Sequence, residues 1–223
     1  MGQEAVALWN GGKDSTLAAH LAAQCGKRII SLATFAPEDA EFLAHPLDFM
    51  GLQAEAMGLP HKVYTIKEPY KQGYVAALKQ IKASGADTVI TGDITEINGH
   101  PNWVRECCKE AGLEVQTPLW AMDREEILRR LFDNRFKAIF SLVKRPWLTE
   151  EWVGRELNED ALARLRTIHD KKGLDLCGEN GEYHTLVLDG PTFKQSIKIK
   201  THTMKIKGDS AYLEVKNADL HDK

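Results

Sequence analysis

The sequence lacks the features that would mark a membrane, secreted or multi-module protein. Its apolar runs, such as residues 5–9, are far short of the ~18 residues that a membrane-spanning helix needs. The N-terminus shows no basic segment, long apolar stretch and cleavage site of a signal peptide, so we expect a cytoplasmic chain with no membrane partner. No repeat and no linker rich in Ser, Gly or Pro divides the 223 residues, which leaves one domain or two small ones that pack together.

The sequence also lacks the clusters typical of metal centres, disulfide scaffolds and nucleic-acid interfaces. The four cysteines form no C-x-x-C pair, and the eight histidines show no H-E-x-x-H spacing. With 29 basic and 32 acidic residues the net charge is −3, so we expect no nucleic acid as a partner. A composition of 43% hydrophobic and 27% charged residues instead fits a globular enzyme.

Apolar patterns of strand length alternate with patterns of helical period over the first half of the chain. We expect strands at residues 5–9, 28–34, 61–66, 88–91 and 113–117, and helices ending at Gly26 or spanning 46–57, 70–84 and 102–111. This order predicts an α/β fold with a doubly wound, mainly parallel sheet.

The pattern changes character in the second half of the chain. Asp123 and Glu126 are spaced as a capping box for a helix that runs to about residue 134. A strand at 137–143, a helix at 158–169 and three later strands, two with alternating lysines, should follow. We place a soft boundary between residues 120 and 135, and divide the chain into 1–130 and a smaller α+β domain at 131–223.

The strongest chemical signal lies directly after the first strand, where residues 10–16 read N-G-G-K-D-S-T and open a helix. Gly11 and Gly12 allow a ligand to approach the backbone closely, and the N–H groups at the helix start attract an anion. The side chains that follow supply a positive charge, a carboxylate for Mg²⁺ or for ordering the loop, and two hydroxyl groups: Lys13, Asp14, Ser15 and Thr16. The segment therefore predicts a phosphate cradle, against the simpler alternative of a strand-to-helix turn with a capping Asp.

A second cluster, Gly92 and Asp93, follows the fourth predicted strand. Ligands of open parallel sheets bind at the carboxyl ends of the strands, so these residues should face the same edge as residues 10–16. Asp93 would there contact Mg²⁺ or substrate, or it is an ordinary turn residue.

A third cluster lies in the glycine-flanked turn at residues 177–185, which reads C-G-E-N-G-E-Y-H-T. A loop that only connects two strands does not need this many ionisable and polar side chains, which are Glu179, Glu182, Tyr183 and His184. A solvated turn without function is an equally good interpretation of this segment alone. Such groups suit the binding of a cation or proton transfer from an amine.

The loop at 10–16 is neither G-x-x-x-x-G-K-[ST] nor G-x-G-x-x-G, and it resembles the S-G-G-x-D-S loop of the N-type ATP pyrophosphatases. These belong to the adenine nucleotide alpha hydrolase superfamily, with a HUP or Rossmann-like fold. The resemblance implies that ATP is cleaved between its α and β phosphates, with Mg²⁺, and that an oxygen of the substrate is adenylated. Asn10 stands where the family usually has serine; its amide can still donate to phosphate, but the hydroxyl is lost.

Carried over to this sequence, the resemblance implies an ATP site with catalytic groups at Lys13, Asp14 and Ser15 and a metal at Asp14 and Asp93. By the same analogy, the end of the second strand at Thr34 would meet the adenine or ribose. The expected nucleotide contacts are Asn10, Gly11, Gly12, Lys13, Asp14, Ser15, Thr16, Thr34, Gly92 and Asp93.

The whole chain, read together, resembles the diphthine–ammonia ligase family. Residues 178–189 match its G-E-x-G-E-[FY]-x-T-x-V-L-D signature, and residues 91–94, 118–120 and 154–157 also fit its pattern. The resemblance implies an amide ligase that adenylates the carboxylate of diphthine, a modified histidine on elongation factor 2, or a related carboxylate. Ammonia would then displace AMP.

In this interpretation the C-terminal part selects the substrate. We expect Glu182 to contact a cation and to assist catalysis, with Glu179 as the partner that fixes the turn, and His184 beside them. Trp120 and Tyr183 would face the trimethylammonium group of diphthine through cation–π contacts.

Two alternatives stay open. The same loop serves tRNA-modifying enzymes, although the missing C-x-x-C pairs and the absence of an RNA-binding module argue against that function. The chain could also be a non-catalytic sensor of ATP or AMP, which the intact Lys13, Asp14 and Ser15 disfavour. The sequence does not set the oligomeric state, and a homodimer is one option.

Overall fold

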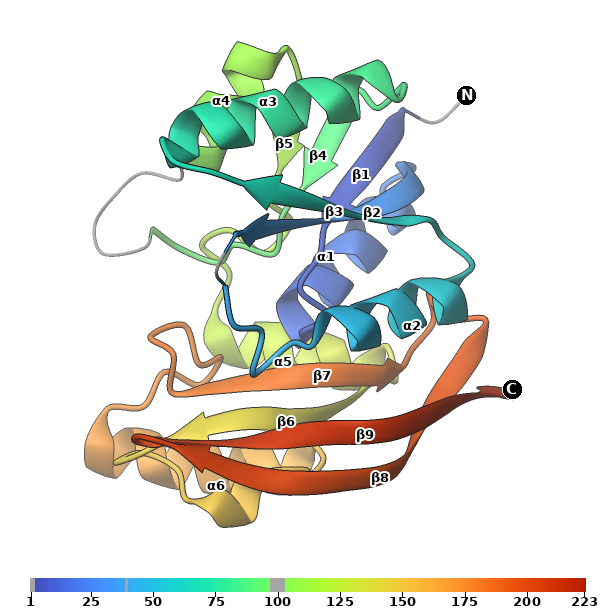
Figure 1. Ribbon diagram of the computed structural model, residues 1–223. Coiled ribbons are helices and arrows are strands. Elements are labelled where there is room, and N and C mark those ends of the chain that lie inside the picture. The colour runs from blue at the N-terminus through green and yellow to red at the C-terminus, as the bar shows by residue number, and fades with distance from the viewer. Residues whose placement is uncertain (1–2, 39, 97–102) are drawn as a thin grey trace. The chain divides into compact units, whose positions relative to one another are not determined.

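A computed structural model describes residues 3–38, 40–96 and 103–223 (Figure 1). Its strands and helices follow the chain in this order: β1 (Glu4–Leu8), α1 (Lys13–Gln24), β2 (Arg28–Pro37), α2 (Leu47–Met57), β3 (His61–Ile66), α3 (Tyr70–Ala83), β4 (Thr88–Ile90), α4 (Trp103–Ala111), β5 (Glu114–Gln116), α5 (Arg124–Asp133), β6 (Lys137–Lys144), η1 (Glu150–Trp152), α6 (Glu159–Lys172), β7 (Tyr183–Asp189), β8 (Gln195–Lys207) and β9 (Ser210–Asp222). None of the described helices is both long and apolar enough to cross a membrane.

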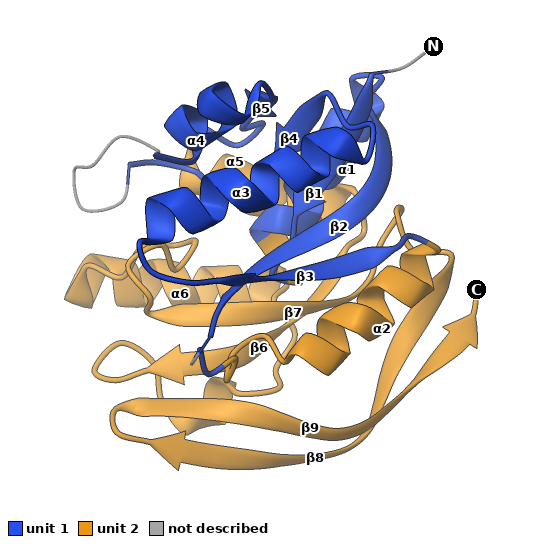
Figure 2. Ribbon diagram, turned by 45° about the horizontal axis from the view of Figure 1, so that its top comes forward, with its two compact units in different colours: residues 1–10, 14–41, 59–121 blue, residues 11–13, 42–58, 122–223 orange. Residues whose placement is uncertain are grey.

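The chain forms two compact units (Figure 2). The first unit contains residues 1–10, 14–41 and 59–121, and the second contains residues 11–13, 42–58 and 122–223. The units therefore do not follow a single cut in the sequence. Two short pieces of the N-terminal half, residues 11–13 of the candidate phosphate loop and the segment with α2, belong to the same unit as the C-terminal strands.

The first unit is built on a five-stranded parallel sheet in the order β3-β2-β1-β4-β5. The central strand β1 is buried on both faces, as its unbroken apolar sequence requires. α3 and α4 cover one face of the sheet and α1 covers the other (Figure 1). The strand order reverses direction between β1 and β4, which is where sheets of this kind bind ligands.

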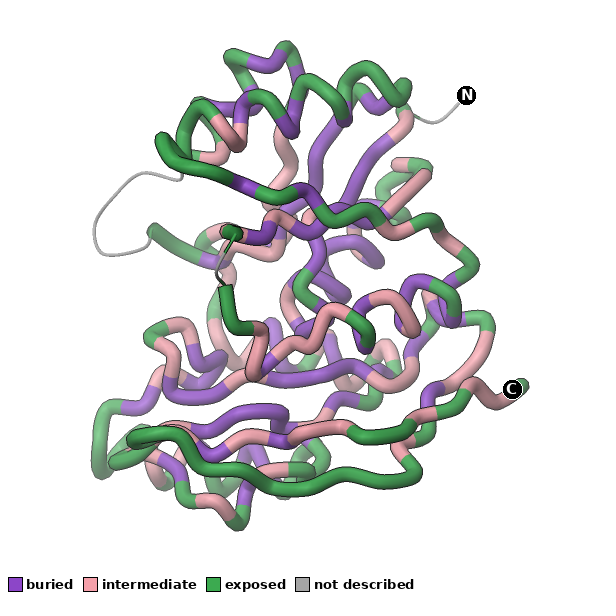
Figure 3. The backbone as a smooth tube through the Cα atoms, in the orientation of Figure 1, coloured by how far each residue is buried: buried purple, intermediate pink, exposed green. Residues whose placement is uncertain are grey.

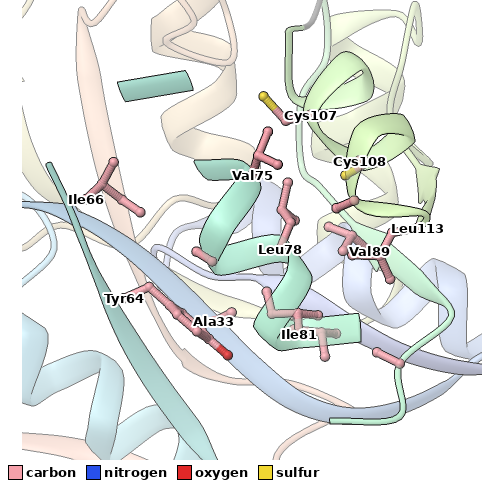
Figure 4. Close-up of a cluster of buried hydrophobic side chains, with 14 residues drawn as sticks. Ala33, Tyr64, Ile66, Val75, Leu78, Ile81, Val89, Cys107, Cys108 and Leu113 are labelled. Atoms are coloured by element: carbon pink, nitrogen blue, oxygen red, sulfur yellow. The ribbon is translucent and has the colours of Figure 1, made fainter. Parts of the chain in front are cut away.

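A hydrophobic cluster fastens α3 and α4 to this sheet (Figure 4). Val75, Leu78 and Ile81 lie on one face of α3 at helical spacing and are at most 5% exposed. They pack with Val89 of β4 and with the buried Cys108 of α4. This cysteine is a packing residue, in line with its burial and its free thiol.

The second unit is built on a four-stranded antiparallel sheet in the order β7-β6-β9-β8. α6 covers one face and α2 lies on the other (Figure 1), where the N–H of Lys194 donates to the carbonyl of Ala56 at the end of α2. Much of the β8–β9 hairpin is exposed (Figure 3). The alternating lysines of β8 belong to this exposed part of the sheet.

The structure confirms the doubly wound parallel sheet and the separate α+β region that the sequence predicts. Most expected elements end within three residues of the observed ones. Asp123 caps α5 as expected, because its carboxylate accepts the N–H groups of Glu125 and Glu126. The helix expected from 102 begins at Trp103, and residue 102 lies outside the described residues. The alternating lysines, at positions 198, 200, 205 and 207, all lie in the single long strand β8, so the expectation of two such strands is wrong.

Candidate functional site

The candidate phosphate loop follows β1 as the sequence predicts. Gly11 adopts φ +77°, a left-handed conformation that favours glycine, and α1 begins two residues later at Lys13. Within the first unit, the Ser15 hydroxyl donates to Oδ1 of Asn10 over 2.7 Å. Asn10 therefore ties the end of β1 to the first turn of α1, a task that its amide oxygen performs.

Two donors from the second unit hold the carbonyl of Gly11. The N–H of Val187 on β7 lies at 3.1 Å, and Nε2 of Gln53 on α2 lies at 2.9 Å. The same Nε2 also donates to the carbonyl of Val187 at 2.8 Å. Gln53 is fully buried, and a Cβ on Gly11 would come within 2.3 Å of its Oε1. Only glycine fits at position 11 while Gln53 keeps this position.

Lys13 connects the loop to the C-terminal signature. Its N–H donates to the Thr185 hydroxyl at 3.0 Å, and its Nζ donates to the carbonyl of Cys177 at 2.5 Å. The ammonium group also lies 5.3 Å from the centre of the Tyr183 ring. Lys13 is only 3% exposed, so its charge sits within the second unit and does not extend freely into solvent.

In the first unit, Gly92 lies against the start of α1. A Cβ at this position would approach the backbone of Asp14 and Ser15 to 2.6 Å. The neighbouring Asp93 accepts a hydrogen bond from the Thr91 hydroxyl at 2.7 Å. The end of β4 and the start of α1 therefore meet, which is the arrangement expected from the parallel topology.

Thr34, the residue expected near the adenine, is buried at the end of β2. Its hydroxyl donates to the carbonyl of Trp9 at 2.7 Å and lies 2.8 Å from Nε2 of His61. Since the hydroxyl donates to Trp9, His61 must supply the proton of the second bond. Burial lowers the pKa of His61, in agreement with a neutral ring. The Thr34 hydroxyl thus orders the strand end.

The turn at residues 175–184 is organised by Glu182, whose side chain is fully buried. Its carboxylate accepts the N–H of Asp175 at 2.8 Å, the N–H of Asn180 at 2.9 Å and the amide of Asn180 at 3.1 Å. We expected Glu182 to reach a ligand and Glu179 to fix the turn. These hydrogen bonds show that Glu182 fixes the turn, because its buried carboxylate accepts three donors from the turn itself. A ligand contact of either glutamate stays a prediction.

A partly buried ion pair anchors the same turn to α5. Nε of Arg124 lies 2.9 Å from a carboxylate oxygen of Asp175, and the other oxygen accepts the N–H of Cys177 at 2.7 Å. Asp175 thus links α5 to Cys177, and the carbonyl of Cys177 accepts the hydrogen bond from Nζ of Lys13.

The two aromatic residues expected to bind a trimethylammonium group are engaged elsewhere. Tyr183 is 1% exposed, packs on Phe140, and donates its hydroxyl to the carbonyl of Leu176 at 2.6 Å. The ring of Trp120, in the first unit, lies 5.3 Å from the guanidinium of Arg105. Each ring already faces a cation of the protein itself, and a contact of either ring with substrate stays a prediction.

His184 lies beside a histidine that the sequence did not single out. Its ring meets the ring of His45 edge to face, with centres 5.2 Å apart. Burial, His184 and Lys13 lower the pKa of His45 to about 3. Burial and Lys13 lower the pKa of His184 to about 4, while Glu182 opposes the shift. Both rings are therefore neutral at neutral pH.

Three site residues escaped sequence reasoning: Gln53, His45 and His61. A single Gln on a helix and two isolated His carry no motif, so their roles depend on contacts between distant segments. The segment at 42–58 holds two of them, and its place in the second unit was the missing information.

Asp14 and Asp93 are compatible with Mg²⁺. Within residues 3–38, 40–96 and 103–223, no group of three or more His, Cys, Asp or Glu could hold a metal. Mg²⁺ in nucleotide sites commonly takes one or two carboxylates and completes its shell with phosphates and water. Two carboxylates at the meeting point of β4 and α1 fit that donor set, and a protein-only metal centre does not.

Comparison with known proteins finds the same family over both halves of the chain. Residues 3–115 match the model of the diphthamide synthase N-terminal domain, and residues 123–220 match that of the C-terminal domain. A solved structure described as a predicted subunit of tRNA methyltransferase from Methanocaldococcus jannaschii gives a TM-score of 0.48 at 17% identity, covering 85% of this chain and 98% of that one. That level of similarity adds nothing to the assignment.

Several curated relatives carry the name diphthine–ammonia ligase. The protein from Schizosaccharomyces pombe is 31% identical over 94% of this chain, which spans 38% of that protein. The rat protein is 27% identical and the human protein 26% identical, each over 97% of this chain and 92% of the relative. With the domain models matched on both sides of residue 120, the chain belongs to the diphthamide synthase family.

Proposed function

We propose that this protein is an ATP-dependent amide ligase that joins ammonia to a substrate carboxylate through an acyl-adenylate. The observation that carries the proposal is the link between its two motifs. The phosphate loop contacts the family signature at two points, Gly11 with Val187 and Lys13 with Thr185, and Lys13 also binds the carbonyl of Cys177 directly before the signature. A loop suited to ATP phosphates and the segment specific to this family are thus parts of one hydrogen-bonded assembly.

In the proposed reaction, an oxygen of the substrate carboxylate attacks the α-phosphorus of ATP. The bond from the α-phosphorus to the bridging oxygen breaks, and pyrophosphate leaves. Ammonia then attacks the acyl carbon, the carbon–oxygen bond to AMP breaks, and a proton passes from nitrogen to water. The first step makes a carboxylate, which is inert towards amines, into a good acyl donor at the cost of one ATP.

The residues of the chain have separate tasks in this scheme. The N–H groups at the start of α1 bind phosphate oxygens, and the positive end of the helix favours their charge. Lys13 supplies a positive charge beside the departing pyrophosphate, and Ser15 and Asn10 keep the loop in shape. Mg²⁺, when bound at Asp14 and Asp93, would neutralise phosphate charge and orient the ATP. Glu182 acts as a positioning residue that maintains the turn beneath Lys13.

The substrate we propose is the carboxylate of diphthine on elongation factor 2, because the curated relatives are named for diphthine and ammonia. A related carboxylate is the alternative. Elongation factor 2 works in the cytoplasm, which is where we place the reaction.

The experiment is to incubate the protein with ATP, Mg²⁺, ammonium and elongation factor 2 that carries diphthine, and to identify the nucleotide products. AMP and pyrophosphate that form only when both acceptors are present support the proposal. Production of ADP contradicts the reaction class. Tight ATP binding without any turnover would support the nucleotide sensor, and AMP formation that depends on tRNA would support the tRNA-modifying alternative.

Elongation factor 2 that lacks the modification is the matched control for the substrate. Equal AMP formation with modified and unmodified factor would overturn diphthine as the substrate, and would leave the amide-ligase chemistry to be assigned to another carboxylate.

A further inference from the structure

Two neutral histidines of the second unit lie next to a buried lysine, and the mechanism above assigns them no task. His45 precedes α2, and His184 lies on β7. Their rings meet edge to face with centres 5.2 Å apart and an angle of 85° between planes. Nδ1 of His45 is buried and has no hydrogen-bond partner among the described residues. A buried polar atom without a partner costs free energy, so it marks a place where a ligand atom would be favourable.

The charges around the pair come from two residues. Lys13, at the start of α1, acts on both rings, and Glu182, on the turn before β7, acts on His184 alone. Glu182 is already bound by three donors of its own turn. The positive charge of Lys13 and burial therefore dominate, and both oppose protonation of the rings.

We propose that His45 and His184 form, with Lys13, a site for the phosphate groups of ATP or for free pyrophosphate, and that the site takes up a proton when it fills. This inference rests on the proposed function. Its geometric basis is the pair itself: the two rings are in contact, Nδ1 of His45 is buried without a partner among the described residues, and both rings lie in the same compact unit as residues 11–13 of the phosphate loop.

Proton uptake is expected because a bound anion changes the electrostatic potential at the two imidazole rings. A multiply charged anion next to Lys13 cancels the charge that keeps the imidazoles neutral, so their pKa values rise towards the ordinary range. A protonated imidazole donates from both nitrogens, which would give Nδ1 of His45 a phosphate oxygen as its partner. The proton comes from water and returns to water when the pyrophosphate leaves, so no covalent step and no further reactant is involved.

The consequence for the reaction is a positive charge that exists only while phosphate is bound. It would add to Lys13 as charge builds on the departing pyrophosphate, and it would be lost after release. Once the two histidines are neutral again, the site binds pyrophosphate less tightly, which favours release of this product.

The test is calorimetry of binding at about pH 6.5 in buffers of different ionisation enthalpy, which gives the number of protons taken up per ligand. The ligands are MgATP and, separately, inorganic pyrophosphate. The wild type is compared with the double variant H45Q/H184Q, whose side chains do not titrate. Protons that the ligand itself gains or loses on binding are counted equally for both proteins. The difference between their proton numbers is therefore the number of protons taken up by the two histidines. The exposed His202 provides the control variant H202Q.

We expect the wild type and H202Q to take up more protons than the double variant with at least one ligand. We also expect their affinity to rise about tenfold more than that of the double variant between about pH 8 and about pH 6. Uptake with pyrophosphate alone would identify free diphosphate as sufficient, and uptake with MgATP only would mean that the nucleotide is needed to place the phosphates. Equal proton numbers in all three proteins would overturn the inference while ATP binding, and the proposed function, stand.

A wild type that binds neither MgATP nor pyrophosphate would instead overturn the proposed function itself. Should the double variant fail to fold, nitrogen spectra of histidine-labelled wild type provide the second measurement. We expect two ring signals to change from neutral imidazole to imidazolium on addition of the ligand that binds. Two rings that stay neutral with the ligand bound would contradict the inference.

Discussion

Gln53 binds the carbonyl of Gly11 through a hydrogen bond of 2.9 Å between groups 42 positions apart in the sequence. The same side-chain nitrogen binds the carbonyl of Val187, so one fully buried glutamine joins the phosphate loop, α2 and β7. The shape of the loop thus depends on residues from the C-terminal half of the chain. This dependence can be tested on ATP binding.

Replacing Gln53 with Leu removes the donor and keeps a side chain of similar size. The Val187 and Gly11 carbonyls each lose a buried hydrogen bond, which should cost about 1–3 kcal/mol of the free energy of unfolding. If the loop shifts as a result, ATP affinity should fall by about tenfold. Urea unfolding and ATP calorimetry measure the two effects. The same change at the exposed Gln80 of α3 is the control, and an unchanged ATP affinity in Q53L would mean that the loop keeps its shape without Gln53.

Replacing Gly11 with Ala tests the close approach directly. The new Cβ would meet Oε1 of Gln53 at 2.3 Å, in addition to the strain of a positive φ. Gly26 has a similar φ of +87° but nothing within 4 Å, so G26A carries the strain alone, about 1–2 kcal/mol. We expect G11A to be the more destabilised protein. In the double variant G11A/Q53A the two effects should be non-additive by at least about 0.5 kcal/mol, because truncating Gln53 relieves the clash. Strict additivity in urea unfolding would rule out that contact.

Replacing Glu182 with Gln should damage the turn and the site together. Both carboxylate oxygens accept N–H groups, so an amide turns one acceptor into a donor that faces another donor. We expect a loss of about 1–3 kcal/mol in stability and a fall in amide formation. E179Q, in the same turn, should be milder in both respects. Thermal unfolding beside the product assay separates the effects, and a fully stable E182Q would contradict the turn-fixing role.

Stability should fall on acidification because of His45 and His184. Their pKa values in the folded protein are lowered to about 3 and about 4, below the ordinary value of 6.5. Between these lowered values and 6.5, the unfolded chain therefore binds more protons than the folded protein. The contribution of the two histidines to the free energy of unfolding is complete above pH 6.5 and decreases as the pH falls below it. Urea unfolding at about pH 7 and about pH 5 should show a smaller loss in H45Q/H184Q than in the wild type or H202Q. Equal losses in all three would contradict a neutral histidine pair in the folded protein.

Local signals in the sequence predict much of the fold and little of the assembly of the site. β1, the glycine turn and α1 follow from apolar runs and from Gly11, and Asp123 caps α5 as its spacing predicts. These features depend on neighbours along the chain, which the sequence displays. The clamp at Gln53 depends on a contact with β7, 134 positions away, and has no local pattern.

The same limit explains why the sequence did not show which of Glu179 and Glu182 fixes the turn. Both lie next to glycines in one turn, and their residue types fit either role. The difference is burial: the chain places Glu182 among the N–H groups of the turn and leaves Glu179 partly exposed. Residue type alone carries no information on that choice.

A substrate carboxylate labelled with oxygen-18 tests the formation of the acyl-adenylate most directly. If the carboxylate is adenylated and ammonia then displaces AMP, one labelled oxygen leaves the substrate with the AMP phosphate. We predict labelled AMP, unlabelled pyrophosphate and an amide product in equal amounts. Label in inorganic phosphate, or an amide formed with unlabelled AMP, would contradict it.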